Sequence, residues 1–133
     1  MSDVAKSKEL LKRYSIARIP FIAINSIERA RTLDILKEIS EELSLPFYVH
    51  TLSKGIYDLI SEKVISDDKS VYGAIDFMSE QMKRKQYMTL VLTEVIDLSS
   101  DNSDSKQILD LVTLANESGG VVIVLTNNAV WNQ

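Results

Sequence analysis

Five polar residues follow the apolar segments that the sequence offers as strands of a parallel sheet. They are Asn25, Ser26, Glu94, Thr126 and Asn127. Ligands of open parallel sheets bind beyond the carboxyl ends of the strands, so a site in this chain would be built from these side chains. Carboxylate, hydroxyl and amide groups gathered there could orient a water molecule, contact a phosphate or hold a magnesium ion.

The turn after the first expected strand lacks the groups that hold a phosphate. A phosphate-binding loop needs glycines whose backbone N–H groups surround the phosphates, followed by Lys and then Ser or Thr. Residues 25–32 contain no glycine, and Thr93 stands before Glu94 where a magnesium-binding aspartate is needed. We therefore expect no catalytic residue and no bound cofactor in this segment. The five polar residues are interpreted as strand-end caps or remnants of a lost site.

Metal-binding patterns are also weak. His50 is the only histidine, and without cysteine or a second histidine a zinc site is not expected. The acidic residues Asp67 and Asp68, and a second set at Asp97, Asp101 and Asp104, match no calcium-loop spacing and are interpreted as solvated loops.

The surface chemistry argues for protein partners rather than nucleic acid. The formal net charge is −4, and the basic run Lys83-Arg84-Lys85 near Tyr87 is interpreted as a solvated helix end. Aromatic residues at Trp131, Tyr57 and Tyr72 either cover this domain's own core or contact a partner, and core packing is the favoured interpretation.

Apolar spacing divides the chain into alternating strands and helices. Nearly continuous apolar runs predict buried strands over 19–24, 47–51, 87–92 and 121–125. A period near 3.6 predicts helices over 27–43, over 71–85 and around 108–115. The stretch 56–64 is predicted to be a short helix or an irregular excursion, and residues 99–105 a polar loop. Helices between consecutive strands favour right-handed parallel crossovers. We therefore expect an α/β fold, a three-layer sandwich with a mainly parallel four-stranded sheet.

Length and composition limit the number of domains and the cellular compartment. With 133 residues, 45% of them hydrophobic, the chain is predicted to form one α/β domain over 1–133. There is no cysteine, no signal peptide and no apolar run long enough to cross a bilayer, so we expect a cytoplasmic protein without membrane contacts. The end at Gln133, a few residues beyond a core strand, suggests an N-terminal piece of a longer protein.

Short segments spread along the chain resemble one family. They are 18–30 (RIPFIAINSIERA), 52–56 (LSKGI), 74–77 (AIDF), 89–92 (TLVL), 108–111 (ILDL) and 121–126 (VVIVLT). This pattern resembles the non-catalytic amino-terminal domain of AAA-family ATPases related to a conserved hypothetical chloroplast-encoded AAA protein and its bacterial relatives. In that group a degenerate, phosphate-loop-NTPase-like domain without the phosphate loop precedes a complete AAA module. By analogy with such ATPases, we expect the four strands in the order 2-3-4-1.

The resemblance implies a non-hydrolysing accessory and interaction domain, with ATP and magnesium bound in a downstream module. It implies the downstream AAA module, neighbouring subunits and a protein substrate as partners, and it carries over no catalytic residue. The alternative is a small stand-alone ligand-binding or hydrolytic domain that uses Asn25, Ser26, Glu94, Thr126 and Asn127.

Overall fold

The computed structural model describes residues 2–25, 29–94 and 103–126. Its helices and strands alternate along most of the chain. In order they are α1 (Ser2–Ile16), β1 (Phe21–Asn25), α2 (Arg29–Leu43), β2 (Phe47–Thr51), β3 (Gly55–Asp58), β4 (Val64–Ser66), α3 (Val71–Arg84), β5 (Thr89–Leu92), α4 (Ser103–Ser118) and β6 (Val121–Thr126).

The strands form one sheet in the order β1-β6-β5-β2-β3-β4. The four strands expected from the sequence are β1, β2, β5 and β6, and their neighbours are parallel. Their order is the predicted 2-3-4-1. The expected count of strands is wrong, because β3 and β4 add two antiparallel strands next to β2 and make the sheet six-stranded and mixed.

The added hairpin occupies the stretch predicted to be helical or irregular. A three-residue turn, 52–54, joins β2 to β3 and ends at Gly55, whose φ of +87° is the left-handed conformation that such turns require. The Asp58 carboxylate then accepts hydrogen bonds from the backbone N–H groups of Ile60 and Ser61, at 2.8 and 3.1 Å, and so ends β3. These local contacts favour strands where apolar spacing alone indicated a helix.

Two other predicted boundaries are corrected. β5 begins at Thr89 rather than at 87, because Tyr87 has a φ of +64° that an extended strand does not accommodate. α4 begins at Ser103, so residues 103–105 of the predicted polar loop belong to a helix, and 95–102 lie outside the described residues.

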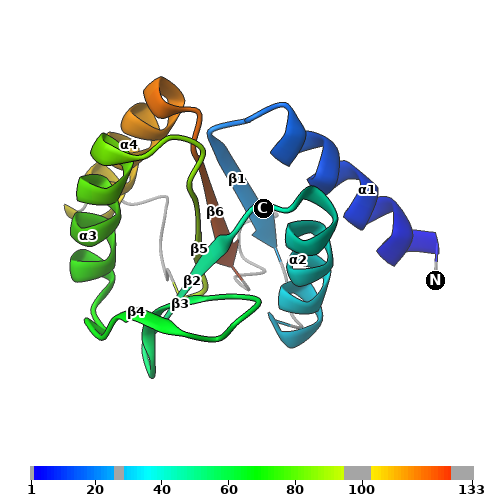
Figure 1. The fold of residues 1–133 in the computed structure, drawn as a ribbon, viewed down its shortest axis with the longest axis horizontal. Helices are drawn as coiled ribbons and strands as arrows, with labels where there is room; N and C mark the ends of the chain where they lie inside the picture. The colour runs from blue at the N-terminus through cyan, green and yellow to red at the C-terminus, as the bar shows by residue number, and fades with distance from the viewer. Residues whose placement is uncertain (1, 26–28, 95–102, 127–133) are drawn as a thin grey trace, which may run out of the picture.

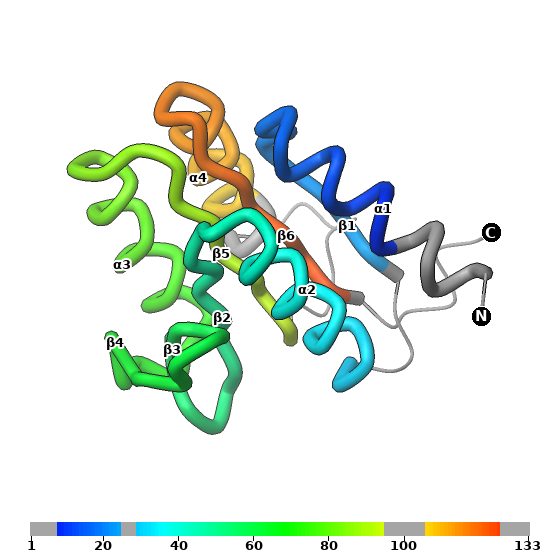
Figure 2. The backbone as a smooth tube through the Cα atoms, turned by 45° about the vertical axis from the view of Figure 1, so that its right-hand side comes forward, coloured from blue at the N-terminus to red at the C-terminus, as the bar shows by residue number. Residues whose placement is uncertain are grey.

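The helices cover both faces of the sheet. Figure 1 shows α3 and α4 on one side and α1 and α2 on the other. The chain crosses the sheet from β1 to β2 and then returns through β5 to β6. Because right-handed crossovers made in opposite directions lie on opposite faces, α2 is separated from α3 and α4 by the sheet. Figure 2 shows the β3–β4 hairpin projecting beyond α2.

Each face has its own apolar core. Leu90 and Leu92 of β5 pack with Met78 of α3 and Leu111 of α4. On the other face, the neighbouring Val91 packs with residues of α1, α2 and the other strands, including Leu11, Leu36, Ile39, Phe47 and Ile123. This alternation along β5 is what a strand covered on both faces requires.

Ion pairs connect α1 to α2. Lys8 pairs with Glu38 at 3.0 Å and with Glu42, and Lys12 pairs with Glu42 at 2.8 Å. Hydrogen bonds from Lys12 and Lys8 lower the pKa of Glu42 to about 2. Together with buried Leu11, these contacts hold α1 against the body of the domain.

Candidate functional site

The predicted strand-end residues converge on the carboxyl edge of the sheet. Asn25 and Thr126 end β1 and β6 and are paired in register. Leu92 of β5 pairs with Val124 of β6, so Glu94 lies at the same edge, two residues beyond β5. Ser26 and Asn127 lie outside the described residues.

Glu94 is already occupied by protein groups. Its Oε1 accepts a hydrogen bond from Nη1 of Arg29 at 2.8 Å, and its Oε2 accepts one from the backbone N–H of Leu52 at 2.7 Å. The Glu94 side chain is 23% exposed and that of Arg29 46% exposed. One carboxylate therefore joins the start of α2, the β2–β3 turn and the end of β5.

The electrostatics keep Glu94 ionised. Burial by itself raises the pKa of Glu94, but the hydrogen bonds from Leu52 and Arg29, with the charge of Arg29, lower it overall. A carboxyl group that serves as a general acid or base near neutral pH needs a raised pKa. The pKa of Glu94 is shifted in the opposite direction, and both carboxylate oxygens accept hydrogen bonds from protein groups.

Thr93 stands where a phosphate-loop ATPase would place a magnesium-binding aspartate, and it is 5% exposed. Its hydroxyl donates a 2.8 Å hydrogen bond to the backbone oxygen of His50 in the neighbouring strand. The Thr93 side chain thus links two strands and is turned toward protein rather than toward a ligand.

His50 is fully buried, and neither ring nitrogen has a hydrogen-bond partner of normal geometry among the described residues. Burial lowers the pKa of His50, while nearby backbone groups of Asp68 and Lys69 and the charges of Glu94 and Asp68 oppose that shift only in part. A neutral, enclosed imidazole of this kind belongs to the core.

Arg29 was not among the residues predicted from the sequence. A cation in the first turn of a helix is disfavoured by the helix dipole, so its position at the start of α2 is a signal that it has an anionic partner. The identity of that partner was not readable, because Glu94 is 65 residues away along the chain.

Three further candidates, Asp68, Lys83 and Tyr87, contact other protein groups. Asp68 accepts hydrogen bonds from the backbone and side chain of Ser70, the N-cap of α3, at 3.0 and 2.8 Å. Lys83 pairs with Glu80 at 3.3 Å. The Arg18 guanidinium lies 4.8 Å from the centre of the Tyr87 ring, so that ring is already stacked by a cation.

Two aromatic candidates are separated by their exposure. Tyr57 is 7% exposed and belongs to the core on the α2 face, as the favoured interpretation held, whereas Tyr72 is 61% exposed. Trp131, Asp97 and Asp101, and the side chain of Asp104, lie outside what the structure describes. Within the described ranges, no group of three His, Cys, Asp or Glu side chains is placed to hold a metal ion.

The character of the helices and the similarity to known proteins complete this description. Over residues 2–25, 29–94 and 103–126, no helix combines the length and apolar character needed to span a membrane. The family model described as the N-terminal domain of SpoVK-like AAA ATPases matches residues 7–131. No curated protein and no solved structure matches the chain.

Proposed function

Because this chain belongs to the family of N-terminal domains of SpoVK-like AAA ATPases, we propose that it is an accessory domain that neither binds nor hydrolyses ATP and acts through protein contacts. ATP and magnesium are bound by an AAA module downstream in the same protein, and the cytoplasm is the compartment of the whole assembly. Neighbouring subunits and a protein substrate are its partners.

The contact between Arg29 and Glu94 carries the proposal. α2 leaves β1 toward one face of the sheet, while α4 follows β5 on the other face, and the carboxyl edge between them is where an open α/β sheet receives its ligand. The 2.8 Å ion pair joins the two sides of that edge. A triphosphate would have to displace Arg29 from Glu94 and would find no glycine in residues 25–32 to bind it.

The alternative is a stand-alone ligand-binding or hydrolytic domain that uses the strand-end residues Asn25, Ser26, Glu94, Thr126 and Asn127, and its hydrolytic form would need Glu94 as the reactive group. The lowered pKa and the two hydrogen bonds of Glu94 do not favour that function. A free carboxyl group with a raised pKa would have favoured it.

Titration calorimetry of the 133-residue chain with ATP and magnesium tests the proposal. We expect no saturable heat, so that any affinity is weaker than about 1 mM. Two obstacles could prevent ATP binding: the Arg29–Glu94 ion pair and the missing phosphate loop. An Arg29→Ala variant removes only the ion pair. We expect this variant not to bind ATP either, because it still lacks a phosphate loop. Micromolar binding to the unmodified chain overturns the proposal.

A further inference from the structure

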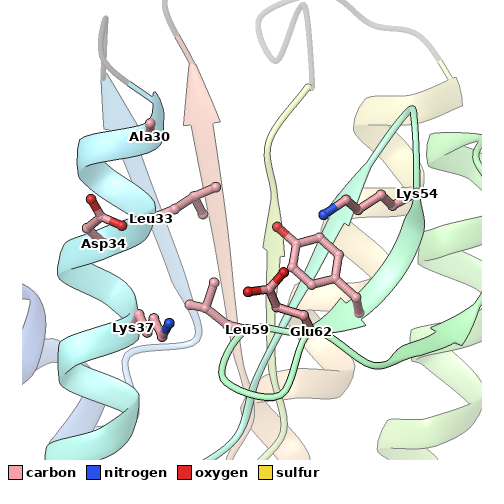
Figure 3. A pocket seen from close by; sticks show the side chains of 8 residues that line it. Ala30, Leu33, Asp34, Lys37, Lys54, Leu59 and Glu62 are labelled. Atoms are coloured by element: carbon pink, nitrogen blue, oxygen red, sulfur yellow. The ribbon is translucent and has the colours of Figure 1, made fainter.

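A groove lies between α2 and the β3–β4 hairpin, and its lining residue Ala30 directly follows Arg29 in the chain. Its volume is about 240 Å³. Figure 3 shows Ala30, Leu33, Asp34 and Lys37 along one wall, on α2, and the hairpin residues Lys54 and Glu62 opposite, with Leu59 between them. Tyr57 of β3 also lines the groove. The four α2 residues are spaced as one stripe of a helix.

The floor of this α2–hairpin groove is apolar. Leu33 is half-buried, and Tyr57 and Leu59 are 7% and 6% exposed. Val64 of β4 pairs with Tyr57, so the two side chains share a face of the sheet, and Val64 is 45% exposed. The apolar floor therefore continues from α2 across the hairpin, over a part of the sheet that extends beyond α2 in Figures 1 and 2.

The rim carries two cations and two anions. Asp34 and Lys37 stand on the α2 wall, and Lys54 and Glu62 on the hairpin wall. Among the described residues, none of the four forms an ion pair, although Lys54 lies 4.9 Å from the centre of the Tyr57 ring. Each wall thus offers one charge of each sign to an incoming molecule.

These features select among possible occupants. The charges of the rim sum to zero, so a free phosphate, a nucleotide or a metal ion gains little there. A helix laid beside α2 would cover the apolar surface that Leu33 and Val64 leave exposed, and would bring acidic and basic side chains on its flanks to the unpaired rim charges.

We propose that the α2–hairpin groove is the docking site for an amphipathic helix of a partner protein, with an apolar stripe on the floor and residues of both charge signs on its flanks. This proposal rests on the proposed function, since it names the surface through which the accessory domain makes protein contacts.

Selection of short helical peptides from a displayed library against the unmodified chain tests this site. We expect enriched peptides to carry an apolar stripe flanked by charges of both signs. Fluorescence anisotropy then gives their affinity for the Lys37→Glu/Lys54→Glu double variant, which alters both walls, and we expect a loss of about tenfold or more. Lys85→Glu/Lys106→Glu makes the same change of charge at exposed positions outside the groove and should leave affinity unchanged.

Three outcomes overturn the docking site. They are the absence of any enriched amphipathic peptide, equal affinity for both double variants, and a dimer of this chain whose formation Lys37→Glu/Lys54→Glu abolishes. None of them depends on nucleotide, so they are distinguishable from ATP binding to the chain, which would overturn the proposed function instead. A Val64→Asp variant adds a second test. It places a charge on the exposed part of the apolar floor, on β4, and should also weaken peptide binding.

Discussion

At the scale of single residues, Glu94 is held by one charged and one neutral donor. We expect Glu94→Gln to lower the free energy of unfolding at pH 7 by about 0.5–1 kcal/mol, since this partly exposed pair is screened by solvent. Urea unfolding measures the change. Glu80→Gln, which removes a pair with Lys83 on a well-exposed helix surface, is the matched control and should change stability less.

The same contact predicts a dependence on pH. The pKa of Glu94 is lower in the folded chain than the ordinary value of 4.5, so the folded state favours the ionised form. Its contribution is complete above the unfolded pKa and is lost as the pH falls through the folded value. The stability difference between the unmodified chain and Glu94→Gln should therefore shrink below pH 4.5, and a difference that is constant with pH would contradict this assignment.

His50 predicts a second loss of stability at falling pH, in a higher pH range than that of Glu94. Burial lowers the pKa of His50 below 6.5, so the unfolded chain binds a proton more readily and stability falls as the pH drops through 6.5 toward the folded value. We expect His50→Leu to raise stability by about 1 kcal/mol, because it removes buried polar atoms without partners. Urea midpoints measured on either side of pH 6.5 should differ less in the variant than in the unmodified chain. Equal pH slopes would show that His50 is not the titrating group.

At the scale of elements, the β3–β4 hairpin depends on Gly55. A Cβ at this position would collide with the backbone oxygen of Ser66, and the φ of +87° strains any other residue. We expect Gly55→Ala to cost about 2 kcal/mol and to speed amide hydrogen exchange first in β3 and β4. Ser53→Ala, an exposed change in the same turn, serves as the control. Unchanged exchange in Gly55→Ala would mean that the hairpin adapts without strain.

Sequence periodicity predicted the four parallel strands, because each buried strand is a short apolar run between helices, whereas their order came from the resemblance to AAA-family ATPases. It missed the hairpin, since Ile56, Leu59, Ile60 and Val64 have the spacing of a helix face, and the glycine turn and the Asp58 cap decide otherwise. Of the polar strand-end residues, Asn25, Glu94 and Thr126 lie at the expected edge, and Ser26 and Asn127 fall outside the described residues. The Arg29–Glu94 contact was not predicted, because pairing between distant residues leaves no local pattern.

At the scale of the whole molecule, β5 contributes to the cores on both faces. Leu90 and Val91 are fully buried on opposite sides of the sheet. We expect Leu90→Ala to cost about 3 kcal/mol. Because the two cores share one sheet, unfolding should stay a single transition. Within each protein, circular dichroism and tyrosine fluorescence should give one common urea midpoint, and the midpoint of the variant should be the lower of the two. Separate midpoints would mean that the two layers unfold independently.

The short outer strand β4 also bears on how this protein behaves at high concentration. A long strand at the edge of a sheet exposes unpaired backbone N–H and C=O groups. Strands of other molecules can pair with these groups, and repeated addition produces fibres. On the β2 side of the sheet, the edge is formed by the antiparallel β3–β4 hairpin. Its outer strand, β4, has three residues and is flanked by Lys63, Asp67 and Asp68. Such an edge offers other copies of the chain little backbone on which to add a strand, and therefore resists uncontrolled polymerisation at high concentration.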